Sequence, residues 1–249
     1  MLVVAQISDL HFCGDSDRRD RINGVLDYLR DRCGGATNID ALVVSGDLTD
    51  EGSAEQYREA ADTLVTGIPT LTLLGNHDDR AAYRSVSRPD DSGDPYAPVN
   101  SVLQLDGLLI LALDSSIPGH NQGAISEETL AWASDQIAAA GDVPVLVAFH
   151  HPPTAVGMPF MDTIAQTDPS GLEAFVRAHP AIIGLVCGHI HSPSAGVFAG
   201  VPVTTAPGVS STLNLPFEGD GVVNDTQPAG IAFHIIDGHR LTTHFRSVC

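Results

Sequence analysis

Strand-sized apolar runs alternate with helix-length amphipathic stretches through most of this 249-residue sequence. Alternation of this kind, followed by a tail of short strands, predicts an α/β fold with mixed sheets covered by helices. The predicted strands are 2–7, 41–45, 70–74, 101–105, 108–113, 143–149 and 182–187, and those of the tail are 196–198, 201–205, 230–236 and 240–245. The predicted helices are 21–32, 53–65, 126–140 (with Ser126 as N-cap) and 170–178.

The sequence contains no internal repeat and no linker-like tract, and its loosest stretch is the Asp-, Gly- and Pro-rich segment 90–98. A length of 249 residues suits one large α/β domain. We therefore expect a single domain over residues 1–249, with a β-rich C-terminal part at 196–249. The apolar run at 143–149 is strand-sized, well short of the ~18 residues that a membrane span needs.

The charge is strongly negative, with 31 acidic residues against 12 basic ones and a formal net charge of −19. Such a surface repels nucleic-acid backbones and anionic membranes, so neither polymeric nucleic acid nor a membrane is an expected partner. An anionic substrate would need the field to be offset locally, and bound metal ions could do this.

The four cysteines, Cys13, Cys33, Cys187 and Cys249, form no Cys-x-x-Cys pair. In a chain that can build its own core they indicate free thiols in a reducing compartment. The N-terminus lacks a basic region before its first apolar run and is typical of a strand rather than a signal peptide. We therefore expect a cytoplasmic protein.

Polar side chains follow five of the predicted strands directly, at the end where α/β proteins bind ligands. Residues two apart in an extended chain point the same way, so each D-x-H or H-x-H pair could present two donors to one site. The donors, in chain order, are Asp9, His11, Asp47, Asn76, His150, His189 and His191, and His77 follows Asn76.

Carboxylates, imidazoles and one amide oxygen suit divalent Mn, Fe, Zn or Co rather than a soft thiolate site. Seven donors exceed what one tetrahedral ion needs but fit two ions that share a bridging carboxylate. Two ions ~3.5–4 Å apart can clamp both oxygens of an in-line displacement and lower the pKa of a bound water toward ~7.

The ordered series Asp9-x-His11, Gly46-Asp47, Gly75-Asn76-His77, His150 and Gly188-His189-x-His191 resembles the calcineurin-like metallophosphoesterase superfamily. His150-His-Pro-Pro153, Met161-Asp162 and Gly75-Asn-His-Asp-Asp79 look like its class III cyclic nucleotide phosphodiesterase and glycerophosphodiesterase branch. The resemblance implies a four-layer α/β/β/α sandwich of two mixed sheets flanked by helices, with the site at the sheet edge.

The resemblance also implies roles for the donors. Asp9, His11 and His191 would hold one metal ion, Asn76, His150 and His189 a second, and Asp47 would bridge them. His77 would lie over the phosphate, and a metal-bound hydroxide would attack in line. The implied catalytic residues are His77, Asp47 and Asn76.

The expected function is therefore hydrolysis of small phosphodiesters, either 3′,5′-cyclic nucleotides such as cAMP or glycerophosphodiesters. Two alternatives stay open: a phosphomonoesterase acting on proteins or nucleotides, and a catalytically silent binding module on the same fold. Proteins of this superfamily often dimerise, and the tail after Gly196 could supply a homodimer interface.

Several residues near these motifs have a structural interpretation. His151 alternates with His150 and is expected to point away from the ions, in a supporting role. Arg80 and Arg84 are interpreted as a solvated, salt-bridged face. Segment 152–166 could either line a substrate pocket or pack.

The remaining candidates show no pattern that indicates chemistry. We expect Arg18, Arg19 and Arg21 to lie in the charged surface leading into the first helix. Cys13 and Cys187 are expected to pack in the core or behind the ligands. The histidines expected to be structural are His120, His179, His234, His239 and His244.

Overall fold

Two mixed sheets form the centre of the protein in a computed structural model that describes residues 1–219 and 221–248. Cys249 therefore lies outside the described residues. One sheet has the strand order β15-β14-β1-β2-β3 and the other has β10-β11-β9-β8-β5-β4. Parallel pairing joins β1 to β2 and β2 to β3 in the first sheet, whereas β14 is antiparallel to β1. In the second sheet β5, β8, β9 and β11 are parallel.

Most predicted elements are confirmed, with small shifts at their ends. The strands of the first sheet are β1 (Leu2–Ile7), β2 (Ala41–Ser45), β3 (Thr70–Leu73), β14 (Ala229–Asp237) and β15 (Arg240–Val248). Those of the second are β4 (Ser101–Leu105), β5 (Leu108–Ala112), β8 (Val145–Ala148), β9 (Ile182–Cys187), β10 (Ser194–Phe198) and β11 (Val201–Thr205). The helices are α1 (Ser16–Asp27), α2 (Ala54–Thr63), α3 (Arg80–Ser87), α4 (Glu127–Ala140), α5 (Pro159–Asp162) and α6 (Ser170–Ala178). Two short pairs, β6 (Ser116–Ile117) with β7 (His120–Gly123) and β12 (Thr212–Leu213) with β13 (Val223–Asn224), complete the list.

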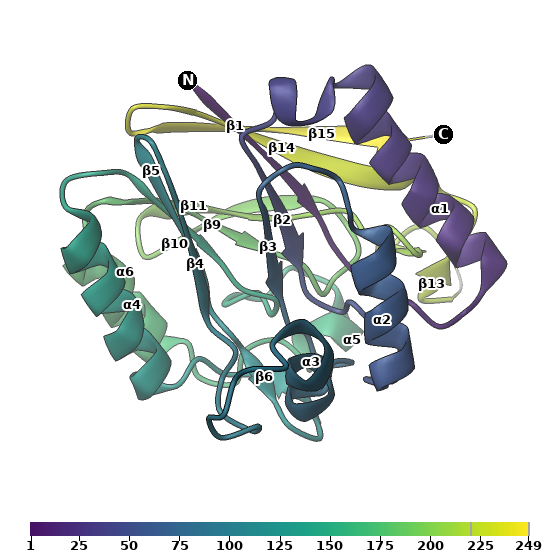
Figure 1. The fold of residues 1–249 in the computed structure, drawn as a ribbon, viewed down its shortest axis with the longest axis horizontal. Helices are drawn as coiled ribbons and strands as arrows, with labels where there is room; N and C mark the ends of the chain where they lie inside the picture. The colour runs from purple at the N-terminus through teal and green to yellow at the C-terminus, as the bar shows by residue number, and fades with distance from the viewer. Residues whose placement is uncertain (220, 249) are drawn as a thin grey trace.

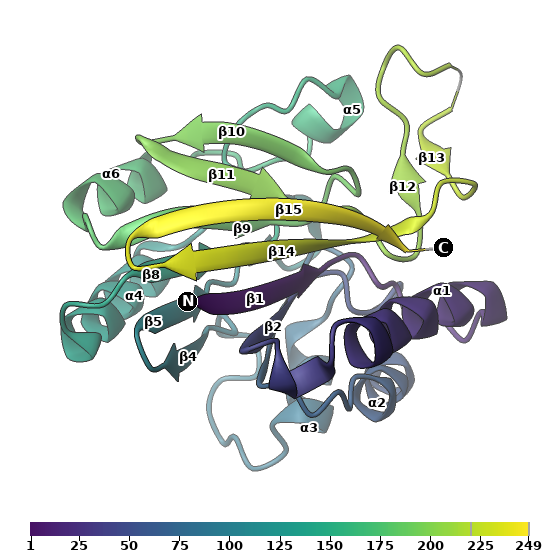
Figure 2. The same ribbon diagram turned by 90° about the horizontal axis from the view of Figure 1, so that it is seen from above.

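Helices cover the outer face of each sheet, which confirms the predicted α/β/β/α layering (Figure 1). Helix α1 lies over the β1 side, and α4 and α6 lie on the opposite side of the molecule (Figures 1 and 2). Three clusters of buried apolar residues hold the layers together: one under α1 and α2, one under α4 and α6, and one between the two sheets.

Strand β2 shows how the sequence sorts its side chains between layers. Leu42 and Val44 pack into the cluster under α1, whereas Ala41 and Val43 pack into the cluster between the sheets. Because successive side chains of a strand point to opposite faces, a strand buried on both faces is apolar along most of its length. All five residues of β2 are buried; the first four are apolar, and Ser45, which ends the strand, accepts a hydrogen bond from the side chain of Gln6 at 2.8 Å.

Helix α1 begins earlier than predicted, at Ser16 rather than Arg21. The Asp15 side chain accepts hydrogen bonds from the backbone N–H groups of Asp17 and Arg18, which makes Asp15 the N-cap. The polar segment read as a charged surface is therefore the first turn of the helix. After Asp27 the chain continues as a π-helical turn at Tyr28–Arg32.

The interpretation of Arg80 and Arg84 as a solvated face is wrong. Arg84 is buried and its guanidinium donates to the carbonyl of Ala97 at 2.9 Å and to that of Pro98 at 3.2 Å. Arg80 lies 2.9 Å from the buried carboxylate of Asp114. The helix that carries both arginines, α3, was not predicted, and it fastens the loop at 90–98 to the body of the protein.

The carboxyl ends of β1, β2, β3, β8 and β9 lie at one edge shared by the two sheets, where the predicted donors follow them. No helix of the described residues is long and apolar enough to cross a membrane.

Candidate metal centre

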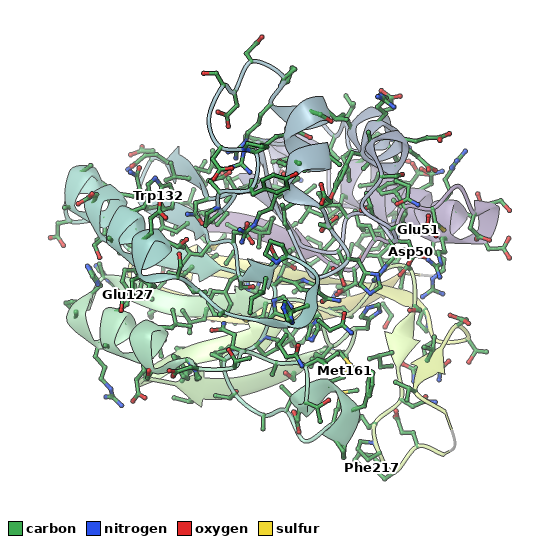
Figure 3. The ribbon with its side chains drawn as sticks, turned by 90° about the horizontal axis from the view of Figure 1, so that it is seen from below. Asp50, Glu51, Glu127, Trp132, Met161 and Phe217 are labelled. Carbon is green, nitrogen blue, oxygen red and sulfur yellow. The ribbon has the colours of Figure 1, made fainter. Side chains whose placement is uncertain are left out.

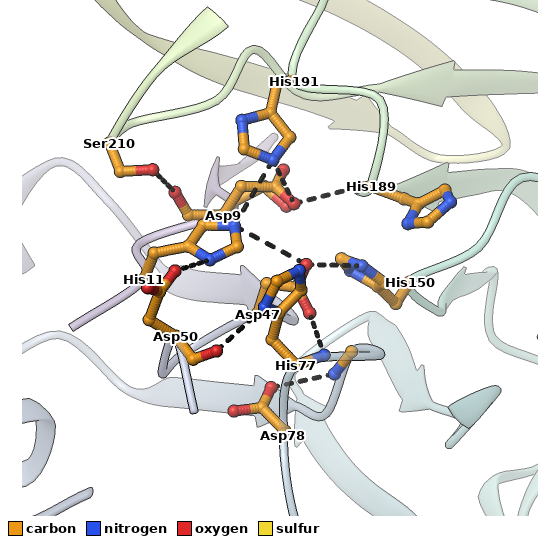
Figure 4. Close-up of polar contacts among 12 residues, drawn as sticks. Asp9, His11, Asp47, Asp50, His77, Asp78, His150, His189, His191 and Ser210 are labelled. Atoms are coloured by element: carbon orange, nitrogen blue, oxygen red, sulfur yellow. Dashed lines mark hydrogen bonds and ion pairs between the residues drawn. The ribbon is translucent and has the colours of Figure 1, made fainter. Parts of the chain in front are cut away.

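Asp47 occupies the middle of the cluster of predicted donors (Figure 4). Its Oδ2 atom lies 3.6 Å from Nε2 of His11 and 3.3 Å from Nε2 of His150. These two imidazoles come from the ends of β1 and β8, which belong to different sheets. A single carboxylate therefore links the two sheets at the site.

Asp9 and His191 complete one side of the cluster. Nε2 of His191 lies 3.5 Å from Oδ1 of Asp9 and 3.4 Å from Nε2 of His11. One donor atom from each of Asp9, His11, Asp47 and His191 lies within 4.8 Å of the others. His150 and His189 lie on the other side, with ring centroids 5.1 Å apart.

The turns that present these donors are left-handed. Five of the six described non-glycine residues with positive φ are predicted ligands; they are Asp9, His11, Asp47, His189 and His191, with φ between 47° and 73°. The extended-chain reason given for the D-x-H and H-x-H pairs is therefore wrong. Asp9 and His11 do converge in one group of donors, whereas His189 groups with His150 and His191 groups with Asp9. Each such residue costs on the order of 1–3 kcal/mol, and such strain is concentrated at functional sites.

Glycines of the same motifs leave the space that the donors occupy. A Cβ atom on Gly75 would lie 2.2 Å from Oδ1 of Asp47, and one on Gly46 would lie 2.4 Å from Nδ1 of His150. Any larger residue at either position would have to displace a donor.

Hydrogen bonds on the far side of the rings fix which nitrogen of each imidazole faces the cluster. Nδ1 of His150 donates to the carbonyl of Ser45 at 2.7 Å, and Nδ1 of His191 donates to that of Ser211 at 3.0 Å. A carbonyl oxygen only accepts, so the neutral rings keep the lone pair on Nε2, which faces the cluster. Outer partners of this kind orient metal-ligating histidines.

Some buried polar atoms of the cluster have no hydrogen-bond partner among the described residues. Oδ2 of Asp9 and Oδ1 of Asn76 are buried without a hydrogen-bond partner. An unpaired buried polar atom costs free energy unless something binds it. Both are hard oxygen donors, so divalent cations fit the residues present.

The ionisable groups of the cluster are strongly coupled. Burial alone would raise the pKa of Asp47, but the neighbouring His150 and His11 rings bring it well below its usual value. Burial alone would lower the pKa of His150, but Asp47 raises it to about 9. Asp47 thus stabilises positive charge beside it, which a bound cation would supply when His150 is neutral and offers Nε2 as a ligand.

His77 stands beside the cluster and lines the same pocket as Asp47. Its backbone N–H donates to Oδ1 of Asp47 at 2.9 Å, and its Nδ1 donates to the carbonyl of Asp50 at 2.9 Å. The ring is thereby held with Nε2 free for another partner. Its centroid lies 4.6 Å from that of His11.

His151 does not point away from the cluster as predicted. Its ring centroid lies 4.9 Å from that of His150 and 4.6 Å from that of His189. Nδ1 of His151 lies 2.9 Å from the hydroxyl of Ser115, and the ring is fully buried. Burial and the neighbouring rings of His189 and His150 bring the pKa of His151 well below its usual value, so the ring packs as a neutral group.

Asp50 was missed from the sequence, although it follows Asp47 by three residues in the same loop. Its Oδ1 lies 3.0 Å from Nδ1 of His11 and 3.0 Å from Nη1 of Arg18. Arg18 itself lines the pocket over the cluster. The assignment of Arg18 to an ordinary charged surface is therefore wrong.

Asp78 is the second missed residue. It accepts hydrogen bonds from the backbone N–H groups of Leu48, Thr49 and Gly75, and so ties the β2 loop to the β3 loop. Burial and the nearby Asp47 carboxylate raise its pKa. It lies in the Gly75-Asn-His-Asp-Asp79 motif of the sequence, but no role was predicted for it.

A pocket of about 400 Å³ opens over the cluster. Segment 152–166 both packs and lines this pocket: Met158 is buried, whereas Phe160 and Ile164 face the cavity.

The sequence profile of the family described as "Calcineurin-like phosphoesterase" matches residues 2–193, more than half of the chain. The chain belongs to this family. The predicted resemblance is therefore confirmed, and the donor set of this phosphoesterase accounts for a divalent-metal requirement.

Curated relatives agree with the family assignment. The chain is 30% identical over 226 residues to a "Probable cyclic nucleotide phosphodiesterase" of Rhodococcus erythropolis, covering 88% of this chain and 74% of the relative. It is also 30% identical over 264 residues to a "Glycerophosphodiester phosphodiesterase" of Enterobacter lignolyticus, covering 99% and 91%. A dimetal phosphatase from Danio rerio shares the fold, with a TM-score of 0.67 at 13% identity over 100% of this chain and 99% of the other.

Proposed function

We propose that this chain is a dinuclear metal-dependent phosphodiesterase that acts on small diesters. The observation that carries the proposal is the position of Asp47, whose carboxylate faces imidazoles from both sheets. A carboxylate that lies between two sets of donors is suitably placed to bridge two metal ions. Two ions on either side of a bridge can clamp the attacking and leaving oxygens of a displacement at phosphorus.

We assign Asp9, His11 and His191 to one ion, and Asn76, His150 and His189 to the other. The donor types suit Mn, Fe, Zn or Co. When bound, such ions activate a water molecule as the nucleophile and stabilise charge on the phosphoryl oxygens.

We assign to His77 the role of donating a proton to the leaving group. Asp50 accepts from Nδ1 of His77, so a protonated ring has only its Nε2–H left to donate into the pocket. Proton donation to a departing alkoxide is the help that a poor leaving group needs. The ring enters the pocket from the loop that follows β3, beside the cluster rather than within it.

The substrates follow from the relatives, which are named for cyclic nucleotides and for glycerophosphodiesters. We infer that this chain hydrolyses diesters of one or both classes, with residues 1–249 acting as one catalytic domain. Among the described residues that line the pocket, Arg18 is the only arginine, and Asp50 and Asp225 are also present, which disfavours doubly charged monoesters.

The test compares bis-p-nitrophenyl phosphate with p-nitrophenyl phosphate on the manganese-loaded protein. We expect the diester to have the higher kcat/KM, and the Asn76→Ala variant to lose turnover of both. Faster cleavage of the monoester would indicate a phosphomonoesterase instead. Absence of turnover with metal bound would indicate a silent binding module.

A second comparison separates the two diester classes. It measures kcat/KM for 3′,5′-cAMP and for glycerophosphoethanolamine. A preference for cAMP of about a hundredfold or more would mean that the pocket recognises the nucleoside. A preference for the glycerophosphodiester, or slow turnover of both, would indicate a scavenging enzyme.

A further inference from the structure

The pocket over the cluster of predicted donors has two chemically different sides. His77 and five of the predicted ligands form its polar floor; these ligands are His11, Asp47, Asn76, His189 and His191. The opposite side, here called the apolar wall, consists of Phe160, Met161, Leu213, Val222 and Val223. None of these side chains can donate or accept a hydrogen bond of ordinary strength.

The apolar wall leaves large side chains in contact with water. Phe160 is 58% exposed, Val222 45% and Val223 59%. Single exposed apolar residues are common, but a contiguous group that borders a catalytic pocket marks a binding surface. Phe160 belongs to α5, whereas Val223 belongs to β13, about sixty residues later in the chain. The two elements lie on the same side of the molecule (Figure 2).

The apolar wall rests on a small core of its own. Met158, Met161, Ile190 and Leu213 form a buried cluster separate from the three that hold the layers together. The carboxylate of Asp162 accepts from the backbone N–H groups of Val156 at 2.7 Å and Gly157 at 3.2 Å, which closes the turn before α5. The wall is thus a packed element and not a loose loop.

Both halves of the apolar wall are tied to residues that follow metal ligands. The hydroxyl of Ser192, next to His191, donates to the carbonyl of Leu213 at 2.9 Å. The side chain of Gln166 donates to the carbonyl of His151, next to His150, at 2.9 Å. The distance from wall to cluster is therefore fixed by short hydrogen-bonded connections. In Figure 3, Met161 lies at α5, with Phe217 farther out toward the edge of the molecule.

We propose that the apolar wall binds an aromatic group of the substrate, so that the enzyme prefers diesters carrying an aryl or nucleobase ring to diesters of glycerol. This inference rests on the proposed function. A ring laid on the wall would cover exposed apolar surface of Phe160 and Val223, whereas the hydroxyls of a glycerol ester would lose water there without gaining a partner.

The test measures binding, so that it does not depend on turnover. The dissociation constants of phenylphosphonate and methylphosphonate are determined by calorimetry on the manganese-loaded protein. Each phosphonate carries a single organic group, so the comparison reports on one binding position for the phenyl ring. We expect phenylphosphonate to bind about tenfold more tightly to the wild type, from the apolar area that it covers.

Three variants locate this preference. Phe160→Ser and Val223→Thr, on the two segments of the wall, should each bring the two constants close together. Phe217→Ser is the matched control, because Phe217 is 82% exposed in the same region but does not line the pocket. It should keep the wild-type ratio.

A ratio near one in the wild type, or a ratio that Phe160→Ser and Val223→Thr leave unchanged, would overturn the proposal. A parallel comparison of AMP with ribose 5-phosphate identifies the ring: an equal gain for AMP points to a nucleobase, and no gain points to an aryl ester. If diesters are not hydrolysed but the phosphonate ratio holds, the proposed function fails while the binding role of the wall stands.

Discussion

The carboxylate of Asp50 lies 3.0 Å from Nδ1 of His11, on the side of the ring away from the cluster (Figure 4). A carboxylate in this position fixes the ring orientation and makes Nε2 a better donor. The same residue accepts from Nδ1 of His77 through its backbone carbonyl. Asp50 therefore supports one predicted metal ligand with its side chain and the predicted proton donor with its backbone.

Asp50→Asn should weaken metal binding about 10- to 100-fold, as other changes to outer partners of metal ligands do. The backbone contact to His77 would remain, so kcat at saturating metal should fall much less than the affinity. Calorimetric titration of metal-depleted protein measures the effect. Glu51→Gln is the control, because its exposed side chain lies next in the chain. Equal affinities for Asp50→Asn and the wild type would contradict this role.

Gly75→Ala should abolish binding of at least one ion and shift the loops that meet at the site. The added Cβ would lie 2.2 Å from Oδ1 and 2.6 Å from the backbone N of Asp47, so both the carboxylate and its loop must move. Gly24→Ala in α1 is the matched control, because a Cβ there meets no atom within 4 Å. That change should raise the free energy of unfolding by about 0.5–1 kcal/mol. Metal content and thermal unfolding check both variants, and full metal content in Gly75→Ala would be the contrary result.

His77→Gln should keep both metal ions and lower kcat by about 10²- to 10⁴-fold for alkyl diesters. The loss should be smaller for p-nitrophenyl diesters, because their leaving group departs without a proton. Steady-state kinetics with both kinds of ester, beside metal analysis, measures this. His120→Gln, on exposed β7, serves as control. An equal loss for the two leaving groups would argue against proton donation.

The titration of His234 should lower the free energy of unfolding in mild acid. Burial lowers the pKa of His234 from its ordinary 6.5 to about 4. The unfolded chain therefore takes up the proton first, and stability falls as the pH drops from 6.5 toward 4. Between pH 7.5 and pH 5 this group should cost about 2 kcal/mol. Denaturant unfolding of His234→Gln should show a correspondingly smaller drop, whereas exposed His239→Gln should match the wild type; equal drops would refute the assignment.

The order of layers and the identity of the donors could be predicted because both follow from short, local stretches of the sequence. Strand β2 is apolar at its first four positions and ends at Ser45, directly before Gly46-Asp47. Strands whose carboxyl ends lie at the same edge of a sheet bring the residues that follow them together there. This is why all seven predicted donors meet at one edge of the sheets.

The missing parts depend on contacts that no local pattern encodes. The left-handed φ of Asp9 and His189 is imposed by the loops they meet and cannot be read from two polar residues. Arg84 resembles a surface arginine until the loop at 90–98 folds over it. Ser211, whose carbonyl orients His191, lies twenty residues from it in a segment with no motif.

The most direct measurement is a titration of metal-depleted protein with Mn²⁺, following bound metal and bis-p-nitrophenyl phosphate turnover together. The account predicts no turnover without metal and full turnover only when two ions are bound. It also predicts that Asp47→Asn loses the second equivalent and the activity with it, because both ions depend on this carboxylate. Full activity with a single ion bound, or in the Asp47→Asn variant, would contradict the dinuclear site.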